Sequence, residues 1–213
     1  MISCIVCGGD TTLLHDQQLP VTYHVCKTCD FIFKDESNRI SNEIEMDQYS
    51  RHNNTMESTG YVTMFKDLIR DYIKPLDIAN KVLDFGSGPG PVLYQLLTEE
   101  GLDAFHFDPF YNPDNAYKDS LYQLITSTEV VEHFFDPIKE FKHLSSLLEK
   151  NGYLLIMTHI RNKDLDVFLN WWYRRDVTHV SFYHLNTFKY IAQVCGLERI
   201  KHNDKNIILF KKK

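Results

Sequence analysis

The sequence lacks long hydrophobic runs. No apolar stretch among its 213 residues approaches the roughly 20 residues of a membrane-spanning helix. The first residues, Met-Ile-Ser-Cys at 1–4, show neither the basic nor the apolar region of a secretory signal peptide. We therefore expect a cytoplasmic protein with no membrane partner.

Positive charge is also scarce. The chain holds 23 Lys and Arg against 29 Asp and Glu, and its formal net charge is −6. Such a chain has no global attraction for nucleic acid, and only a local basic patch would provide one. Residues 1–35 contain no dense Lys/Arg stripe. A nucleic-acid partner is therefore disfavoured.

Cysteine is rare, yet four of the five cysteines form two pairs. Cys4-x2-Cys7 and Cys26-x2-Cys29 have zinc-ligand spacing, and a site of four cysteines is closed and structural rather than catalytic. Two disulfides are the alternative, but nothing marks the chain as secreted. Cys195 lies in an apolar helical run and is expected in the core.

Three regions follow along the chain. Residues 1–35 are interpreted as a zinc ribbon, too short to bury a sufficient core without the metal. Residues 36–58 are polar and form a linker or a lid, and residues 59–213 form the main domain.

Hydrophobic periodicity in the main domain alternates between helix and strand. We expect helices at 59–74, 91–100, 136–152 and 187–195, and strands at 81–85, 104–107, 122–126, 153–158, 197–202 and 206–211. This order predicts an α/β fold with a doubly wound, mainly parallel sheet. Ligands of such sheets bind beyond the carboxyl ends of the strands.

A glycine turn follows the first of these strands. The sequence K-V-L-D-F-G-S-G-P-G at 81–90 places Asp84 before Gly86, Gly88 and Gly90. Glycines let a ligand approach the backbone, and the next helix offers free N–H groups, so a nucleotide-like cofactor is expected. The dinucleotide fingerprint spaces its last glycine one residue further.

The glycine turn resembles the first motif of class I S-adenosylmethionine-dependent methyltransferases. Further segments resemble the same family: Asp108 after the second strand, S-T-E-V-V-E-H-F-F-D-P at 127–137, Leu148-x3-Gly152, and D-V-T-H-V-S-F-Y at 176–183. The resemblance implies a Rossmann-like methyltransferase fold that binds S-adenosyl-L-methionine, and it is closest to the ubiquinone-biosynthesis subgroup.

The resemblance also implies the cofactor-binding residues. They are Asp84, Gly86, Ser87, Gly88, Gly90, Thr128 and Glu129 for the methionine part, and Asp108 with Pro109 for the ribose. The family usually places a strand and an adenine-binding acid where only a short stretch separates Asp108 from Tyr122. Asp119 or a backbone contact would replace that acid.

Histidines are the candidate general bases that take a proton from the methyl acceptor, because histidine titrates near neutral pH. The candidates are His133, His159 and His179, with Asp176 as the orienting carboxylate of His179; a packing role for His179 is the alternative. Glu129, Glu132 and His133 share one face of a helical turn. Their E-x-x-E-H pattern resembles a divalent-metal site of the ubiquinone subgroup. The alternative is that Glu132 caps or braces the local structure and His133 lines the pocket.

The segment 168–175 holds both tryptophans and forms either a lid over a flat acceptor or a helix packed on the core.

The leading hypothesis is a methyltransferase acting on a small-molecule acceptor. The alternatives are an RNA methyltransferase whose ribbon contacts nucleic acid, as the ribbon resembles that of some ribosomal-RNA enzymes, and a non-catalytic S-adenosylmethionine-binding protein.

Overall fold

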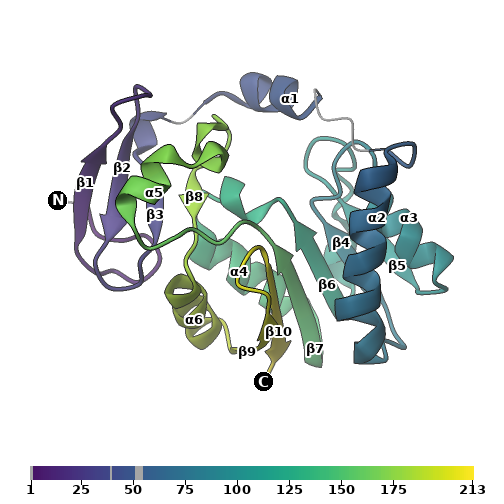
Figure 1. Ribbon diagram of the computed structural model, residues 1–213. Coiled ribbons are helices and arrows are strands. Elements are labelled where there is room, and N and C mark those ends of the chain that lie inside the picture. Colours follow the sequence, from purple (N-terminus) through teal and green to yellow (C-terminus); the bar gives the residue numbers. More distant parts are fainter. Residues whose placement is uncertain (1, 39, 51–54) are drawn as a thin grey trace.

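The fold is built on a six-stranded sheet with helices on both faces (Figure 1). In this computed structural model, residues 2–38, 40–50 and 55–213 are described. The sheet has the strand order β5-β4-β6-β7-β10-β9. Its strands are β4 (Val82–Phe85), β5 (Ala104–Phe107), β6 (Tyr122–Thr128), β7 (Leu148–Met157), β9 (Leu197–His202) and β10 (Ile207–Lys212).

The sheet is mixed rather than fully parallel. Strands β5, β4, β6 and β7 run parallel, and β10 and β9 close one edge in antiparallel pairing. In the described part of the chain, no strand separates β5 from β6; a 3-10 turn, η4 (Asn115–Asp119), fills that stretch. The predicted doubly wound, mainly parallel α/β fold is confirmed.

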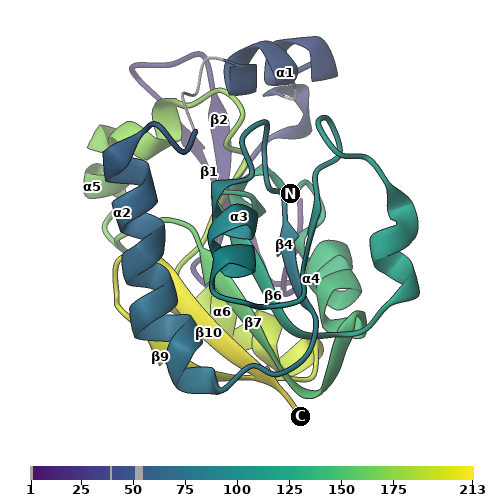
Figure 2. The ribbon, with the colours of Figure 1, turned by 90° about the vertical axis from the view of Figure 1, so that its right-hand side faces the viewer.

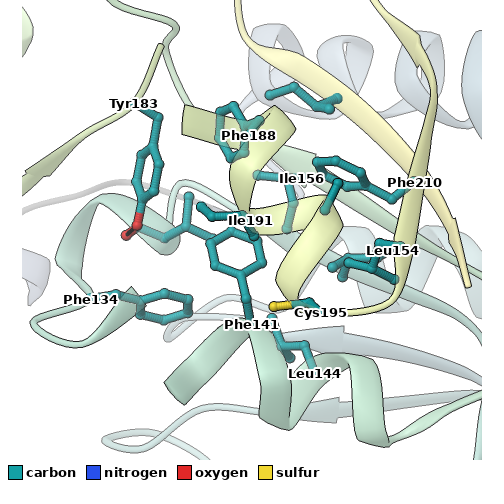
Figure 3. Packing of buried hydrophobic residues seen from close by; sticks show 14 of the residues in the cluster. Phe134, Phe141, Leu144, Leu154, Ile156, Tyr183, Phe188, Ile191, Cys195 and Phe210 are labelled. Atoms are coloured by element: carbon teal, nitrogen blue, oxygen red, sulfur yellow. Dashed lines mark hydrogen bonds between the residues drawn. The ribbon is translucent and has the colours of Figure 1, made fainter. Parts of the chain in front are cut away.

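Two separate cores lie on the two faces of the sheet. On one face pack α2 (Thr59–Leu68) and α3 (Val92–Glu99), seen in Figure 2 in front of the strands. On the other face pack α4 (Pro137–Ser146) and α6 (Leu185–Val194). There Phe141 and Phe188 pack with Ile156 and Phe210 (Figure 3). Side chains that alternate along a strand point to opposite faces of the sheet and so belong to different cores.

Several element boundaries differ from the sequence prediction. The helix expected to reach residue 152 ends at Ser146, and the strand expected to begin at 153 begins at Leu148, which pairs with Tyr122. Apolar residues at helical spacing continue past the helix end, so periodicity alone misplaced it. The helix at 59–74 is α-helical to Leu68 and then continues as a π turn, η2 (Ile69–Ile73), and a 3-10 turn, η3 (Lys74–Leu76).

The N-terminal residues form a second, antiparallel sheet of order β1-β2-β3-β8. Strands β1 (Thr11–His15), β2 (Thr22–Cys26) and β3 (Ile32–Lys34) come from the predicted ribbon, whereas β8 (Ser181–Phe182) comes from the main domain. The ribbon therefore shares a sheet with a segment almost 150 positions away, and the boundary at residue 35 stays a prediction.

The stretch predicted as linker or lid contains a 3-10 turn, η1 (Glu36–Asn38), and α1 (Asn42–Ser50). Figure 1 shows α1 above the gap between the ribbon and α2. Residues 39 and 51–54 of this predicted stretch lie outside the described residues. No helix in the described ranges is long and apolar enough to cross a membrane.

Candidate active site

A cavity of about 750 Å³ opens where β4, β5 and β6 end. It is lined by all predicted cofactor residues except Gly90, and by His133, Asp176 and His179 from the predicted acceptor side. Gly90 instead serves the turn, because its carbonyl accepts a hydrogen bond from Val92 N at 2.7 Å. His159 lies outside the cavity lining and packs against the rings of Trp172 and Tyr173.

The glycine turn closes tightly against neighbouring elements. Gly86 has a φ of +83°, and its N–H donates to the Phe107 carbonyl at 2.8 Å. A Cβ atom at Gly86 would lie 2.3 Å from Cγ2 of Val130, which no side chain tolerates. Both the backbone conformation and the approach of Val130 therefore require glycine here.

Asp84 is the buried acid at the end of β4. Thr126 on the adjacent strand donates its hydroxyl to Oδ1 of Asp84 at 3.0 Å. Burial raises the pKa of Asp84 to about 7, because a carboxylate loses hydration there. A cationic ligand group beside Asp84 would favour the ionised carboxylate and so lower its pKa again. The resulting ion pair would bind the ligand.

Asp108 ties the turn after β5 to the glycine turn. Its Oδ2 accepts the N–H of Gly88 at 2.9 Å, and its Oδ1 accepts those of Phe110 and Tyr111 at 2.9 and 3.0 Å. A carboxylate has about four lone-pair sites, so one site, on Oδ2, remains for a ligand hydroxyl. Asp108 thus both shapes the cavity and presents an acceptor to it.

Tyr173 joins two buried glutamates. Its hydroxyl lies 2.6 Å from Oε1 of Glu132 and 3.1 Å from Oε2 of Glu129. Thr158 donates to the other oxygen of Glu132 at 2.9 Å. Burial and the neighbouring Glu132 raise the pKa of Glu129 to about 9, so Glu129 is protonated at neutral pH. The central place of Tyr173 cannot be read from the sequence, since an aromatic segment carries no signal for it.

Two neutral histidines, His133 and His179, pack edge to face in the part of the cavity predicted to hold the acceptor. Nδ1 of His179 donates to the Tyr173 carbonyl at 2.8 Å, and Nδ1 of His133 donates to the Thr178 carbonyl at 3.1 Å. Since a carbonyl only accepts, each Nε2 carries the lone pair. Burial lowers the pKa of both rings to about 4, so both are neutral at pH 7. Nε2 of His179 lies 3.9 Å from Oδ2 of Asp176.

Glu132, His133 and His179 also form a potential metal-binding cluster. Their ligand atoms all lie within 4.8 Å of one another. This set differs from the predicted one, because His179 from a distant segment stands where the sequence pattern suggested Glu129.

The four paired cysteines converge at the ribbon. The Sγ atoms of Cys4 and Cys29 are 3.7 Å apart, those of Cys7 and Cys26 are 3.4 Å apart, and all four lie within 4.8 Å. All are free thiols, far beyond disulfide bonding distance. A tetrahedron with Zn–S bonds of about 2.3 Å separates its sulfurs by roughly 3.8 Å, so the cluster fits a zinc ion.

The glycine turn, the acids at the strand ends and the order of the sheet together define an α/β enzyme with a nucleotide-type cofactor cleft. The family model described as "Methyltransferase domain" matches residues 50–202, which is more than half of the chain. The chain therefore belongs to this family of methyltransferases, as the sequence motifs predicted. No curated protein matches the chain.

Solved structures share the fold at low sequence identity. A SAM-dependent methyltransferase from Archaeoglobus fulgidus is 19% identical; the match covers 81% of this chain and all of that one, with a TM-score of 0.53. The protein TnmH is 14% identical over 80% of this chain and 57% of its own, with a TM-score of 0.58. The DszA carbon methyltransferase is 15% identical over 72% and 55%, with a TM-score of 0.50.

We predict that Gly86→Ala destabilises the protein more than Gly101→Ala. Both glycines have similar φ values, +83° and +85°, but a Cβ at Gly101 meets nothing within 4 Å. The shared left-handed backbone costs about 1–2 kcal/mol, and the contact with Val130 adds about 1–3 kcal/mol. Denaturant unfolding measures both free energies.

Adding Val130→Ala to Gly86→Ala removes the nearest methyl groups and should restore part of the loss. Equal costs for the two glycine substitutions would contradict the proposed steric role of Val130.

Proposed function

We propose that the protein transfers a methyl group from S-adenosyl-L-methionine to a small-molecule acceptor. The observation that carries this proposal is the cavity itself, because it is lined by predicted donor-side and acceptor-side residues together. Methyl transfer is an in-line displacement, and holding both reactants in one cavity supplies much of its rate.

The donor half consists of the glycine turn with the two acids at the strand ends. Asp84 is buried at the base of the turn and is suited to the cofactor ammonium, while Asp108 is suited to the ribose hydroxyls. Gly88 and Ser87 of the glycine turn also line the cavity. Thr128 and Glu129 line the cavity at the end of β6, where the methionine part is expected.

In the acceptor half, His179 acts as the general base. Its neutral Nε2 takes the proton of an acceptor hydroxyl or amine as the methyl group arrives. Asp176, 3.9 Å from that nitrogen, stabilises the imidazolium that forms. His133, with its ring centroid 5.0 Å from that of His179, orients the acceptor. Trp172 lines the cavity and is 62% exposed, which suits a lid. Helix α1 also suits a lid, because its Glu45 lines the cavity.

A second use of the same residues is divalent-metal binding by Glu132, His133 and His179. The grouping of one carboxylate and two imidazoles favours it, because these are ligands of divalent transition metals. Such an ion would polarise the acceptor and lower the pKa of its hydroxyl. The two uses compete, since a metal-bound Nε2 accepts no proton.

The burial of the acceptor-side groups favours a small acceptor over RNA. Tyr173 and His179 are 1% and 7% exposed, so an acceptor has to enter the cavity to reach them. The formal charge of −6 also weakens attraction to a polyanion. An RNA methyltransferase and a non-catalytic binding protein remain the alternative functions.

We propose that the four ribbon cysteines hold a structural zinc ion. Their separations suit four thiolates around one ion, and Cys26 Sγ also accepts the N–H groups of Thr28 and Cys29 at 3.3 and 3.4 Å. The metal would stabilise a turn region that buries little surface of its own.

We expect calorimetry to detect S-adenosylmethionine binding, and Asp108→Asn to weaken it at least about tenfold, since the amide loses the charge that strengthens hydrogen bonds to the ribose. Thermal unfolding of the variant checks that its fold is intact.

Binding of S-adenosylmethionine should also weaken as pH falls below about 7, because Asp84 takes up a proton there. Absence of binding to wild type at millimolar cofactor would refute the donor assignment.

A screen with radiolabelled cofactor tests the acceptor class. We expect label in small-molecule pools rather than in total RNA, and loss of at least about 100-fold in rate for His179→Ala with cofactor affinity retained. Repeating the assay after chelation separates base from metal: activity that persists without divalent ions supports the base. Label found mainly in RNA would overturn the small-molecule proposal.

We expect metal analysis to find about one zinc ion per chain in protein purified under reducing conditions. Cys26→Ser should lose the metal and lower the unfolding temperature, because the ribbon shares its sheet with β8. Cys195→Ser is the matched control, since Cys195 is a buried thiol outside the cluster. Metal-free wild-type protein would remove the zinc proposal.

A further inference from the structure

Residues 172–180, here called the acceptor segment, carry Tyr173, Asp176 and His179 into the cavity. One side of the segment is held by η5 (Val131–His133), since Val180 N donates to the Glu132 carbonyl at 2.9 Å. The other side faces the ribbon, residues 2–35. The position of the acceptor-side groups thus depends on two supports that are far apart in sequence.

Lys34 links the ribbon to the backbone of this segment. Its side chain is buried in β3, and its Nζ donates to the carbonyls of Asp176 and Val177, both at 3.1 Å. No described carboxylate forms an ion pair with Lys34, and burial lowers its pKa to about 8. A buried ammonium is costly unless its hydrogen bonds are satisfied, so these carbonyls are held firmly in place.

Arg174 supplies a second link. Its side chain is fully buried and pairs with Asp16, which is 1% exposed and lies in the turn between β1 and β2. The guanidinium also donates to Oε1 of Gln18 at 2.8 Å and to the Leu169 carbonyl at 2.8 Å. Breaking such a pair leaves an uncompensated buried charge, so the turn and the segment are strongly joined.

Backbone pairing continues the connection. Ile32 pairs with Phe182 and Phe33 with Ser181, and Lys34 N donates to the Val180 carbonyl at 2.9 Å. In contrast, Asp84 and Asp108 are held by the large sheet and its turns. None of the described residues 2–35 lines the cavity.

We propose that Lys34 is a positioning residue that places Asp176 and His179 at the acceptor end of the cavity, with the Asp16–Arg174 pair as a second anchor. The ribbon then acts on the acceptor half of the site, whereas Asp84 and Asp108 of the donor half are held by the large sheet and its turns. This inference rests on the proposed function, and the structural part of it is testable without any acceptor.

The test uses Lys34→Met, which keeps the length of the side chain and removes its donors. Trp172 begins the acceptor segment, and Trp171 directly precedes it and packs on the Tyr173 ring with centroids 4.9 Å apart. Trp171 is half-buried, so its fluorescence in a Trp172→Phe background reports on the segment. We expect acrylamide quenching to rise about twofold as the segment loosens. Calorimetry should show cofactor affinity within about twofold of wild type, because the contacts that hold Asp84 and Asp108 involve neither Lys34 nor the acceptor segment.

Thr187→Val is the matched control. The Thr187 hydroxyl donates to the Cys29 carbonyl at 2.8 Å and so links the ribbon to α6 without touching the acceptor segment. We expect this variant to lower the unfolding temperature while tryptophan quenching stays at the wild-type value. Once an acceptor is known, Lys34→Met should raise its KM and leave cofactor affinity unchanged, and Lys34→Arg should restore part of the effect.

Wild-type quenching in Lys34→Met would overturn the proposal, as would an equal change in Thr187→Val. If Lys34→Met does not fold, Asp16→Asn gives the comparison at the second anchor, because it removes the charge that pairs with buried Arg174. Unchanged quenching in that variant would also overturn the proposal. Wild-type protein that fails to bind S-adenosylmethionine would instead refute the proposed function, since the tryptophan measurement needs no cofactor.

Discussion

The parallel pairing of β4 with β5 and β6 is the constraint on which the site depends. In that ladder Asp84 pairs with His106 on one side and with Thr126 on the other. Strands in parallel register end at the same edge, so the glycine turn and Asp108 must lie together there. Burial at that edge then raises the pKa of Asp84 to about 7 and makes the acid responsive to a cationic ligand.

The acceptor side depends on a different kind of contact. Tyr173 places one hydroxyl between Glu129 and Glu132, and the pKa of Glu129 rises to about 9. The cavity therefore carries less negative charge at neutral pH than a count of its acids suggests. The carbonyls of Tyr173 and Thr178 hold the Nδ1–H of His179 and His133, which leaves both Nε2 atoms as acceptors.

The ribbon belongs to this architecture because β3 and β8 share a sheet. A short cysteine-rich segment buries little surface alone, and here β8 adds a fourth strand to its sheet. Two buried cations, Lys34 of the ribbon and Arg174 of the main domain, bridge the two parts. The cysteines in turn hold the turns that carry β2 and β3. The four-cysteine cluster and the acceptor segment are therefore joined through one antiparallel sheet.

The order of elements and the place of the glycine turn could be predicted from sequence, since both rest on local signals, and the assignment of the donor half stays a prediction. Strands β5 and β9 have the predicted bounds, and the turn with Gly86 and Gly88 lies where its spacing indicated. The end of α4 was misplaced, because apolar spacing alone does not distinguish a helix from the strand that follows it. Gly90 and His159 were assigned to the site by motif and position, but neither lines the cavity.

Local residue patterns by themselves determined the α/β order, the cysteine pairs and the glycine turn, because each depends on neighbours a few positions apart. Only the tertiary structure decided the rest. It brought His179 to Glu132 and His133, placed Tyr173 between two glutamates, and joined Lys34 to the acceptor segment. These contacts link residues about 40 to 140 positions apart, and burial, which sets their protonation, exists only once the chain has folded.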